Sequence, residues 1–280
     1  MAETHLPTLH PRTRGKSRYV YAVRARRSHG ISVGINLDPQ KTCNFDCVYC
    51  EVIDRREIAK GTGRPPIAVG DVARELAEEL AARSRPAGPS AADPVRDIAF
   101  AGDGEPSTFR GFLPLARTLF DVRDAAGFGH VPFVLITNGS GLARDEMREA
   151  HDLFQSRGGT FWIKLDAGTE GFYRMICRSG IPFEKTLANL AGAAKRHPVV
   201  VQAMFLRLRG EPPPRDEIAA WASRLAAVVD AGGRFSLVQV YTVARETMEP
   251  GVTPLTREEL EDIAGAARAA VPGVPVETFV

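Results

Sequence analysis

The sequence lacks the features that mark membrane and secreted proteins. Its longest apolar stretch, residues 199–206, is far shorter than the roughly 20 residues that cross a bilayer. The first residues contain no apolar segment of the kind found in secretory signals. Net charge is only +2 over 280 residues, so bulk charge alone predicts no nucleic-acid partner. We therefore expect a cytoplasmic protein with no membrane partner.

Cysteine is also scarce, and its distribution is uneven. Three of the four cysteines, Cys43, Cys47 and Cys50, lie within eight residues, and Cys177 stands apart. A disulfide framework is not expected, because a chain of this length has no need of one and three adjacent thiols cannot pair evenly. The clustered thiols indicate instead a metal or cluster site in a reducing compartment.

The apolar pattern predicts an α/β protein. Hydrophobic residues make up 44% of the chain and charged residues 25%, as in ordinary globular proteins. An alternating segment at 31–37 is followed by continuous apolar runs, which are typical of buried parallel strands. These runs are at 98–101, 133–136, 161–165, 199–206 and 235–240, and a short seventh strand is expected near residue 276.

Segments with helical periodicity separate these strands. The pattern predicts a partial (β/α)6 TIM-like barrel, and a doubly wound open sheet is the alternative that periodicity leaves open. We assign residues 31–280 to this barrel domain and residues 1–30 to a basic N-terminal arm. Before the last helix, Thr256 and Glu259 predict a capping box.

Polar and glycine-rich segments follow the predicted strands. In α/β folds, functional groups gather at the carboxyl ends of the strands, so these segments are expected to meet at one site. They read NLDPQKTCNFDCVYC, AGDGEPS, ITNGS, IKLDAG, LRLRGE and YTVARE along the chain.

The cysteine spacing is C-x3-C-x2-C on the loop after the first barrel strand. Three thiolates there can hold three irons of a [4Fe–4S] cluster and leave the fourth iron open to another ligand. A structural zinc site would need a fourth ligand at short spacing. The preceding histidine, His29, is fourteen positions before Cys43. The spacing therefore favours the cluster.

The motif resembles that of the radical S-adenosylmethionine (SAM) enzymes, C-x3-C-x-φ-C with an aromatic φ, which is Tyr49 here. The resemblance implies the radical SAM type of partial barrel, with a [4Fe–4S] cluster and SAM as cofactors. It further implies that the open iron binds the methionyl part of SAM. Reductive cleavage then gives methionine and a 5′-deoxyadenosyl radical, which abstracts hydrogen from a substrate.

Further segments match this family in order along the chain. Its Gly-Gly-Glu element, which lines the methionyl group of SAM, corresponds to Gly102-Asp103-Gly104-Glu105, with Asp in place of the first Gly of the usual element. Its ribose-contacting element corresponds to the segment from Lys164 to Asp166, and Asn138 has a similar role at the preceding strand end. Tyr49 is expected to pack on the adenine.

Within the superfamily, the chain is most similar to a group related to the wyosine-forming tRNA-modification enzymes. The segments ARRSHGISVGINLDPQKTCNFDCVYCE, GDGEPS, LITNGS and IKLDAG carry this likeness. Wyosine-forming enzymes hold a second cluster with upstream cysteines, whereas residues 1–42 contain none here. The flavodoxin domain of some relatives is also absent, so we expect an external one-electron donor of the flavodoxin or ferredoxin type.

The substrate is predicted to be anionic, with RNA as the leading candidate. Residues 5–37 contain no acidic residue and many arginines, a composition that can neutralise phosphates. We expect Arg26, Arg27 and Arg245 to contact the substrate, and Cys177 to be a candidate hydrogen donor to a radical intermediate. A small metabolite or a peptide is the alternative substrate. A non-catalytic iron–sulfur electron-transfer protein is the alternative function.

Overall fold

The computed structural model describes residues 17–27, 30–52, 67–84 and 94–280. The strands are β1 (Val20–Ala25), β2 (Gly30–Ile35), β3 (Val95–Phe100), β4 (Phe133–Thr137), β5 (Thr160–Lys164), β6 (Val199–Met204), β7 (Arg207–Leu208), β8 (Phe235–Tyr241), β9 (Val252–Thr253) and β10 (Val276–Phe279). The helices are α1 (Val69–Ser84), α2 (Phe112–Ala125), α3 (Asp145–Ser156), α4 (Glu170–Cys177), α5 (Phe183–Arg196), α6 (Arg215–Asp230) and α7 (Arg257–Ala270), with a 3-10 turn η1 (Pro106–Thr108).

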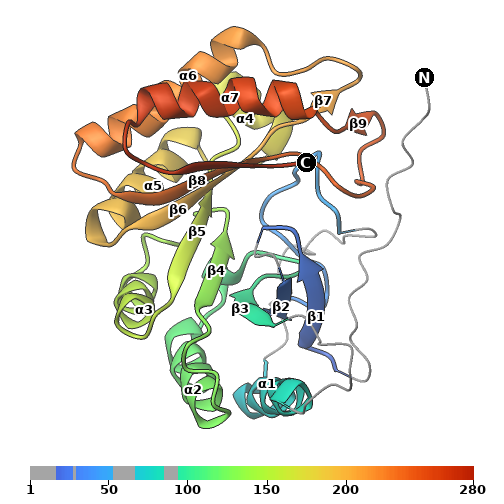
Figure 1. Cartoon of the computed structure of the whole chain (residues 1–280), viewed down its shortest axis with the longest axis vertical. Coiled ribbons are helices and arrows are strands. Elements are labelled where there is room, and N and C mark those ends of the chain that lie inside the picture. Colours follow the sequence, from blue (N-terminus) through green and yellow to red (C-terminus); the bar gives the residue numbers. More distant parts are fainter. Residues whose placement is uncertain (1–16, 28–29, 53–66, 85–93) are drawn as a thin grey trace.

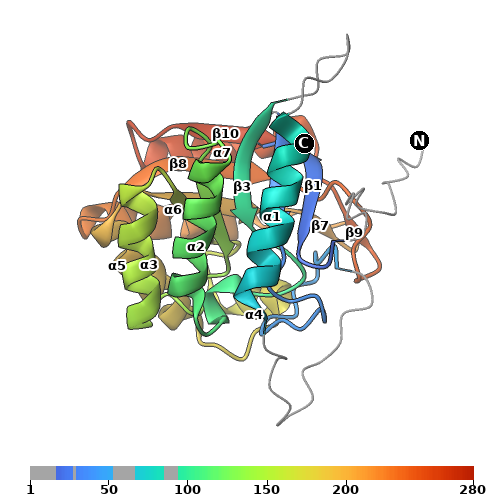
Figure 2. The ribbon, with the colours of Figure 1, turned by 90° about the horizontal axis from the view of Figure 1, so that it is seen from below.

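Within these ranges, one eight-stranded sheet has the order β1-β2-β3-β4-β5-β6-β8-β10. Neighbouring strands are parallel except for β1, which is antiparallel to β2. The sheet curls into a half-barrel with the helices on its outer face (Figures 1 and 2). This confirms the predicted partial barrel over the doubly wound sheet, and all seven predicted strands are present.

Apolar residues on both faces of the strands hold the layers together. All six residues of β6 are buried, as the continuous apolar run predicted. On the outer face, Phe120 and Phe154 pack edge-to-face at 5.2 Å between ring centroids, which joins α2 to α3 above the sheet. The capping box predicted at Thr256 and Glu259 is present at the start of α7.

The first strand lies inside the segment that the sequence assigned to the basic arm. Residues Val20–Ala25 pair with β2 along their whole length, from Val20 opposite Ile35 to Ala25 opposite Gly30. Arg24, which is exposed, interrupts the apolar pattern, and this explains why the strand was not expected. The barrel therefore includes residues before position 31, and the rest of the expected arm, residues 1–16, lies outside the described ranges.

The residues that follow β1 contact the end of β8, near the other edge of the curled sheet. The Arg26 side chain donates a 3.5 Å hydrogen bond to the Thr242 carbonyl oxygen, just beyond β8. The Arg27 guanidinium lies 4.5 Å from the ring centroid of Tyr241. Arg26 and Arg27 thus reach from the end of β1 to the end of β8.

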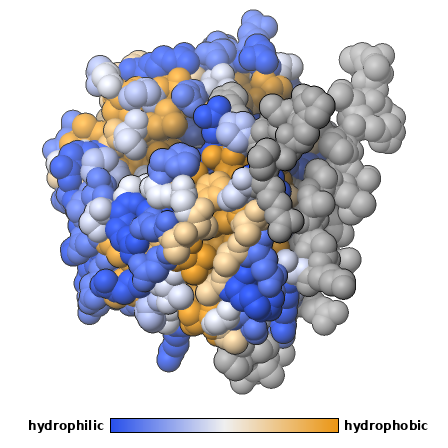
Figure 3. All heavy atoms as spheres, turned by 60° about the horizontal axis from the view of Figure 1, so that its bottom comes forward, coloured by the Kyte–Doolittle hydropathy of each residue, from blue (hydrophilic) through white to orange (hydrophobic). Residues whose placement is uncertain are grey.

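The outer surface shows no membrane-spanning element. In the described ranges, no helix is both long and apolar enough to cross a bilayer. Figure 3 shows hydrophilic side chains over much of one face, with hydrophobic residues between them.

Candidate active site

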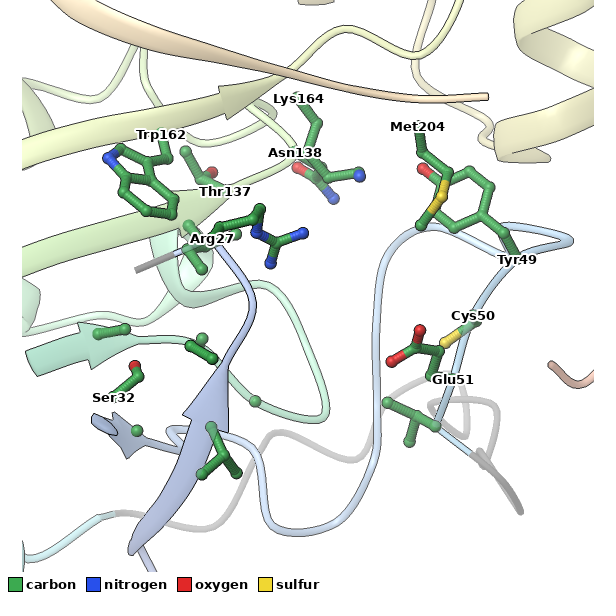
Figure 4. A pocket seen from close by; sticks show the side chains of 18 of the residues that line it. Arg27, Ser32, Tyr49, Cys50, Glu51, Thr137, Asn138, Trp162, Lys164 and Met204 are labelled. Carbon is green, nitrogen blue, oxygen red and sulfur yellow. The ribbon is translucent and has the colours of Figure 1, made fainter. Parts of the chain in front are cut away.

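A cavity of about 330 Å³ opens inside the half-barrel, lined from β1 through β8 and by the loops after β2 and β3. Figure 4 shows labelled side chains from several of these elements directed toward it. It brings together most of the residues predicted from the sequence: Arg26, Arg27, Cys43, Cys47, Tyr49, Cys50, Gly102, Gly104, Glu105, Asn138, Lys164 and Arg245. Asp103, Asp166 and Cys177 do not line this cavity.

The three clustered cysteines lie on the loop that follows β2. Backbone hydrogen bonds fasten this loop to the end of α4, from Asp46 N–H to the Cys177 carbonyl at 3.2 Å and from Val48 N–H to the Ile176 carbonyl at 2.9 Å. Cys50 N–H closes a turn on the Cys47 carbonyl at 3.1 Å. The loop therefore presents all three thiols to the cavity on a fixed backbone.

Burial affects the acidity of these thiols. It raises the pKa of Cys43 to about 12 and that of Cys50 to about 11. A hydrogen bond from Cys177 lowers the pKa of Cys47, against the effect of burial. Metal ligation requires the thiolate forms, so iron at this site would have to stabilise three buried negative charges.

The donors at this site are three cysteine thiols, Cys43, Cys47 and Cys50, which line one cavity. Thiolates are the ligands of iron–sulfur clusters, and three of them would hold three irons of a [4Fe–4S] cluster and leave the fourth iron open. In the described part of the chain, no group of three or more His, Cys, Asp or Glu side chains is placed to hold a single metal ion.

The loop after β3 packs directly on the cysteine loop, and glycine makes this approach possible. A Cβ atom on Gly104 would lie 2.3 Å from Asp38 Oδ2 and 2.5 Å from the Thr42 carbonyl oxygen. Asp103 between the two glycines is buried, and Asn36 donates a 2.7 Å hydrogen bond to its carboxylate. Asp103 thus braces the two loops from outside the cavity.

Glu105 joins the ends of β3 and β4. Its carboxylate accepts hydrogen bonds from the Asn138 N–H at 2.7 Å, from the Ser107 N–H at 2.9 Å and from the Thr137 hydroxyl. Burial raises the pKa of Glu105, while these hydrogen bonds oppose the change. Several hydrogen-bond donors of the protein already bind this carboxylate. The main role of Glu105 in the structure is therefore to fix the shape of the cavity wall.

Tyr49, Lys164 and Asp166 form one buried network. The Tyr49 hydroxyl donates to Asp166, whose other oxygen accepts from the Met204 N–H at 2.8 Å. Lys164 Nζ lies 3.3 Å from Asp166 Oδ1 and 4.8 Å from the Tyr49 ring centroid. Burial by itself would lower the pKa of Lys164, but the Asp166 carboxylate, Tyr241 and Cys47 together outweigh it and the pKa is raised. Asp166 therefore orients its neighbours and does not line the cavity.

Tyr241 is a central residue that the sequence did not single out. Its hydroxyl accepts a 2.7 Å hydrogen bond from Lys164 Nζ, and its ring carries the Arg27 guanidinium. The signal in the sequence that could have identified Tyr241 is its position directly after the predicted strand at 235–240. Its contacts with Lys164 and Arg27 depend on how far the sheet curls, which the sequence pattern does not specify.

Cys177 lies on the far side of the cysteine loop. It is 3% exposed at the end of α4, and its thiol interacts with Cys47. The structure thus brings Cys177 next to one of the cluster-motif cysteines, and Cys177 does not line the cavity.

Three arginines gather on one wall of the cavity. Arg245 forms an ion pair with Glu51, the residue after Cys50. Burial lowers the pKa of Arg26, and the positive charge of Arg27 lowers it further. The site therefore combines three thiols with an excess of positive charge.

Two curated relatives share 28% of their aligned residues with this chain. One is "GTPase Obg" of Brachyspira hyodysenteriae, matched over 177 residues that cover 62% of this chain and 23% of that protein. The other is "UPF0026 protein MJ1312" of Methanocaldococcus jannaschii, matched over 159 residues, 54% of this chain and 41% of that protein. The chain thus spans less than half the length of these relatives.

Among solved structures, Streptococcus suis SuiB bound to S-adenosylmethionine has the same fold, with a TM-score of 0.60 at 10% identity over 91% of this chain and 52% of that one. The family model of the radical SAM superfamily matches residues 37–222, from before the cysteine motif to α6. This family implies SAM and a [4Fe–4S] cluster as cofactors. The chain therefore belongs to the radical SAM superfamily and is an enzyme of the radical SAM type.

Proposed function

We propose that this enzyme cleaves SAM reductively and uses the resulting 5′-deoxyadenosyl radical to abstract hydrogen from an anionic substrate. The observation that carries the proposal is the shared cavity. Cys43, Cys47 and Cys50 face the same space as Arg26, Arg27 and Arg245. A radical formed at the cysteine loop would arise beside a substrate whose negative charge the arginines attract.

The cysteines hold the cluster in this proposal, and the cluster supplies the electron for SAM cleavage when it is bound. Gly102 and Gly104 have no side chains, so their backbone groups can approach the methionyl part of SAM closely. Lys164 and Asn138 line the cavity on the neighbouring strand ends and supply hydrogen bonds to the nucleoside. Tyr49 places its ring beside Lys164 for contact with the adenine.

The finer grouping also belongs to the proposal. We place the chain near the wyosine-forming enzymes on its sequence segments, but we do not assign it wyosine chemistry, because residues 1–42 contain no cysteine for a second cluster. The electron would come from an external flavodoxin or ferredoxin. The non-catalytic alternative is disfavoured because electron-transfer clusters usually have four protein ligands.

RNA is the candidate substrate that the basic N-terminal segment favours. Each phosphate contact would make affinity fall by about one power of the salt concentration. Full-length protein and a variant lacking residues 1–18 would therefore be compared for RNA binding at two ionic strengths. Salt-sensitive binding that weakens on truncation supports RNA. Binding to neither protein would contradict it and leave a small anionic metabolite as the substrate.

The reaction itself is tested with anaerobically reconstituted protein, dithionite and SAM. Formation of 5′-deoxyadenosine by the wild type, and its loss together with the iron in Cys47→Ala, is the expected result. Perturbation of the cluster's electron paramagnetic resonance spectrum by SAM separates a radical SAM site from an electron-transfer cluster. A Cys47→Ala variant that retains about four irons per chain would contradict the ligand assignment.

A further inference from the structure

Arg27 lines the cavity, and no carboxylate among the described residues pairs with it. Its guanidinium lies over the Tyr241 ring at 4.5 Å, which fixes the orientation of its planar fork. Among the described residues, Arg27 has no side-chain hydrogen bond or ion pair, although it lines the cavity. Figure 4 shows the side chain directed into the open space near Thr137 and Asn138. The guanidinium is thus oriented toward open space where none of the described residues binds it.

Arg26 is a second arginine of the cavity whose guanidinium lacks part of its hydrogen bonds among the described residues. Its Nη2 atom reaches the Thr242 carbonyl at 3.5 Å, at the limit of a hydrogen bond. Its Nη1 atom is buried and has no hydrogen-bond partner among the described residues. Leaving a charged donor unsatisfied is costly, so a bound acceptor near Arg26 would be favourable.

The other charges of the cavity are already matched. Arg245 pairs with Glu51, and Lys164 pairs with Asp166. The Glu105 carboxylate accepts a hydrogen bond from the Asn138 N–H, directly after β4. Asp97 accepts a hydrogen bond from Ser32 deeper in the barrel. Arg24 also lines the cavity and has a partner. Within the described residues, Arg26 and Arg27 therefore remain without a direct ion pair, although the Glu51 carboxylate attracts Arg26.

Building on the proposed function, we propose that Arg27 and Arg26 form a site for the dianionic group of the substrate, a phosphate monoester, and that Tyr241 positions this site. Two cations match one dianion, whereas an internal RNA phosphodiester carries a single negative charge. Arginine forks bind phosphate oxygens in pairs, which gives orientation as well as charge. A small phosphorylated molecule and the phosphorylated end of an RNA present the same chemistry.

Tyr241 acts on two cations through different parts of its side chain. The ring face supports Arg27, and the hydroxyl accepts the hydrogen bond from Lys164 at 2.7 Å. Removing only the hydroxyl should therefore disturb Lys164 and spare the anion site. Removing the ring should release Arg27 as well. This separation distinguishes a positioning role from a general loss of structure.

The test uses reconstituted holoenzyme and two small probes, methyl phosphate and dimethyl phosphate, at matched ionic strength. Calorimetric titration should show methyl phosphate binding at least about tenfold more tightly than the monoanionic diester, because only the monoester presents two charges near neutral pH. Arg27→Met should weaken methyl phosphate binding by about tenfold or more. Arg117→Met, which removes an exposed arginine of α2, is the matched control and should bind like the wild type.

The two Tyr241 variants complete the experiment. Tyr241→Phe should keep methyl phosphate binding within about twofold of the wild type, and Tyr241→Leu should lose about as much as Arg27→Met. Equal binding of the two probes, or wild-type binding by Arg27→Met, would overturn the inference. A Tyr241→Phe variant as weak as Tyr241→Leu would overturn the role of the ring.

Two RNA oligonucleotides that differ only in a 5′-phosphate identify the source of the group. A gain from the phosphate that depends on Arg27 points to an RNA end, and methyl phosphate binding without such a gain points to a small molecule. SAM cleavage is measured on the same wild-type preparation, so that a failure of the anion site can be distinguished from a failure of the proposed function. Cleavage without methyl phosphate binding contradicts this inference alone. Methyl phosphate binding without cleavage contradicts the proposed function and leaves the anion site supported.

Discussion

The Glu75 carboxylate on α1 accepts a 2.7 Å hydrogen bond from the backbone N–H of Tyr19, directly before β1. The same carboxylate accepts from the N–H groups of Val20 at 3.0 Å and Arg18 at 3.1 Å. Glu75 is only 6% exposed. A helix on the outer layer thus secures the edge strand whose other end presents Arg26 and Arg27 to the cavity.

Glu75→Ala is therefore expected to destabilise the barrel. Three backbone donors would lose their acceptor, which costs about 2–4 kcal/mol in the free energy of unfolding when such groups stay buried. Glu75→Gln keeps one acceptor oxygen, so its free energy of unfolding should lie between those of the wild type and Glu75→Ala. Urea unfolding measures the series, with Glu78→Ala as control, since that exposed residue of α1 only pairs with Arg74. An unchanged midpoint in Glu75→Ala would show that β1 does not depend on this contact.

The glycine-rich loop after β3 gives a prediction about cluster assembly. A Cβ on Gly104 would collide with the Thr42 carbonyl, and Thr42 directly precedes Cys43. Gly104→Ala should thus displace the cysteine loop and lower the iron bound per chain after reconstitution. Gly265→Ala is the control. Gly265 lies within α7 with open space around it, so alanine there should stabilise the protein by about 0.5–1 kcal/mol and leave iron unchanged. Full iron content in Gly104→Ala would contradict the close packing of these loops.

Much of the barrel followed from the apolar pattern, because strands buried on both faces leave continuous hydrophobic runs. Two of the elements, β1 and α2, were not identified individually from the sequence. The pattern of β1 is broken by Arg24 and preceded by basic residues, and its place in the sheet depends on pairing with β2. Helix α2 was not singled out, although its apolar face packs under Phe154 through Phe112 and Phe120. Both elements are fixed by contacts with other segments, β1 by its pairing with β2 and α2 by its packing on α3.

The residues of the site were easier to name than their roles. The cysteine spacing and the strand-end rule indicated one common site, and the cavity contains most of the residues so identified. Asp103 and Asp166 have the expected positions along the chain, but their carboxylates bind neighbouring groups of the protein. Sequence reasoning gives the strand end and the residue type. It does not give the direction of a side chain, which is decided by partners such as Asn36 and Met204.

His151 makes stability depend on pH. The imidazole is buried, stacks on Phe161 at 4.1 Å and lies next to His197. Burial, assisted by the charge of His197, lowers the pKa of His151 to about 3. The unfolded chain binds this proton below about pH 6.5, whereas the folded protein does not, so stability falls with acid by up to about 1.4 kcal/mol per pH unit between these values.

His151→Phe keeps the aromatic stack and removes the titrating group. Its unfolding free energy should therefore change less between pH 6.5 and pH 4 than that of the wild type, as measured by urea unfolding at several pH values. His130→Asn, at an exposed position, provides the comparison and should retain the wild-type slope. Parallel curves for His151→Phe and the wild type would mean that other groups cause the acid sensitivity.

The position of Cys177 leads to a prediction that separates ligand from neighbour. Its thiol interacts with Cys47 from outside the cavity, so it should not bind iron. Cys177→Ala is expected to keep the wild-type iron content and SAM cleavage, with a stability loss of about 1–2 kcal/mol for the small cavity left behind. Cys47→Ala, prepared in parallel, should lose both iron and cleavage. Iron analysis and 5′-deoxyadenosine formation measure the two effects.

Loss of iron in Cys177→Ala would show that Cys177 is a cluster ligand. Continued SAM cleavage without substrate conversion would instead support the hydrogen-donor role expected from the sequence, and would require a path from Cys177 to the cavity past Cys47.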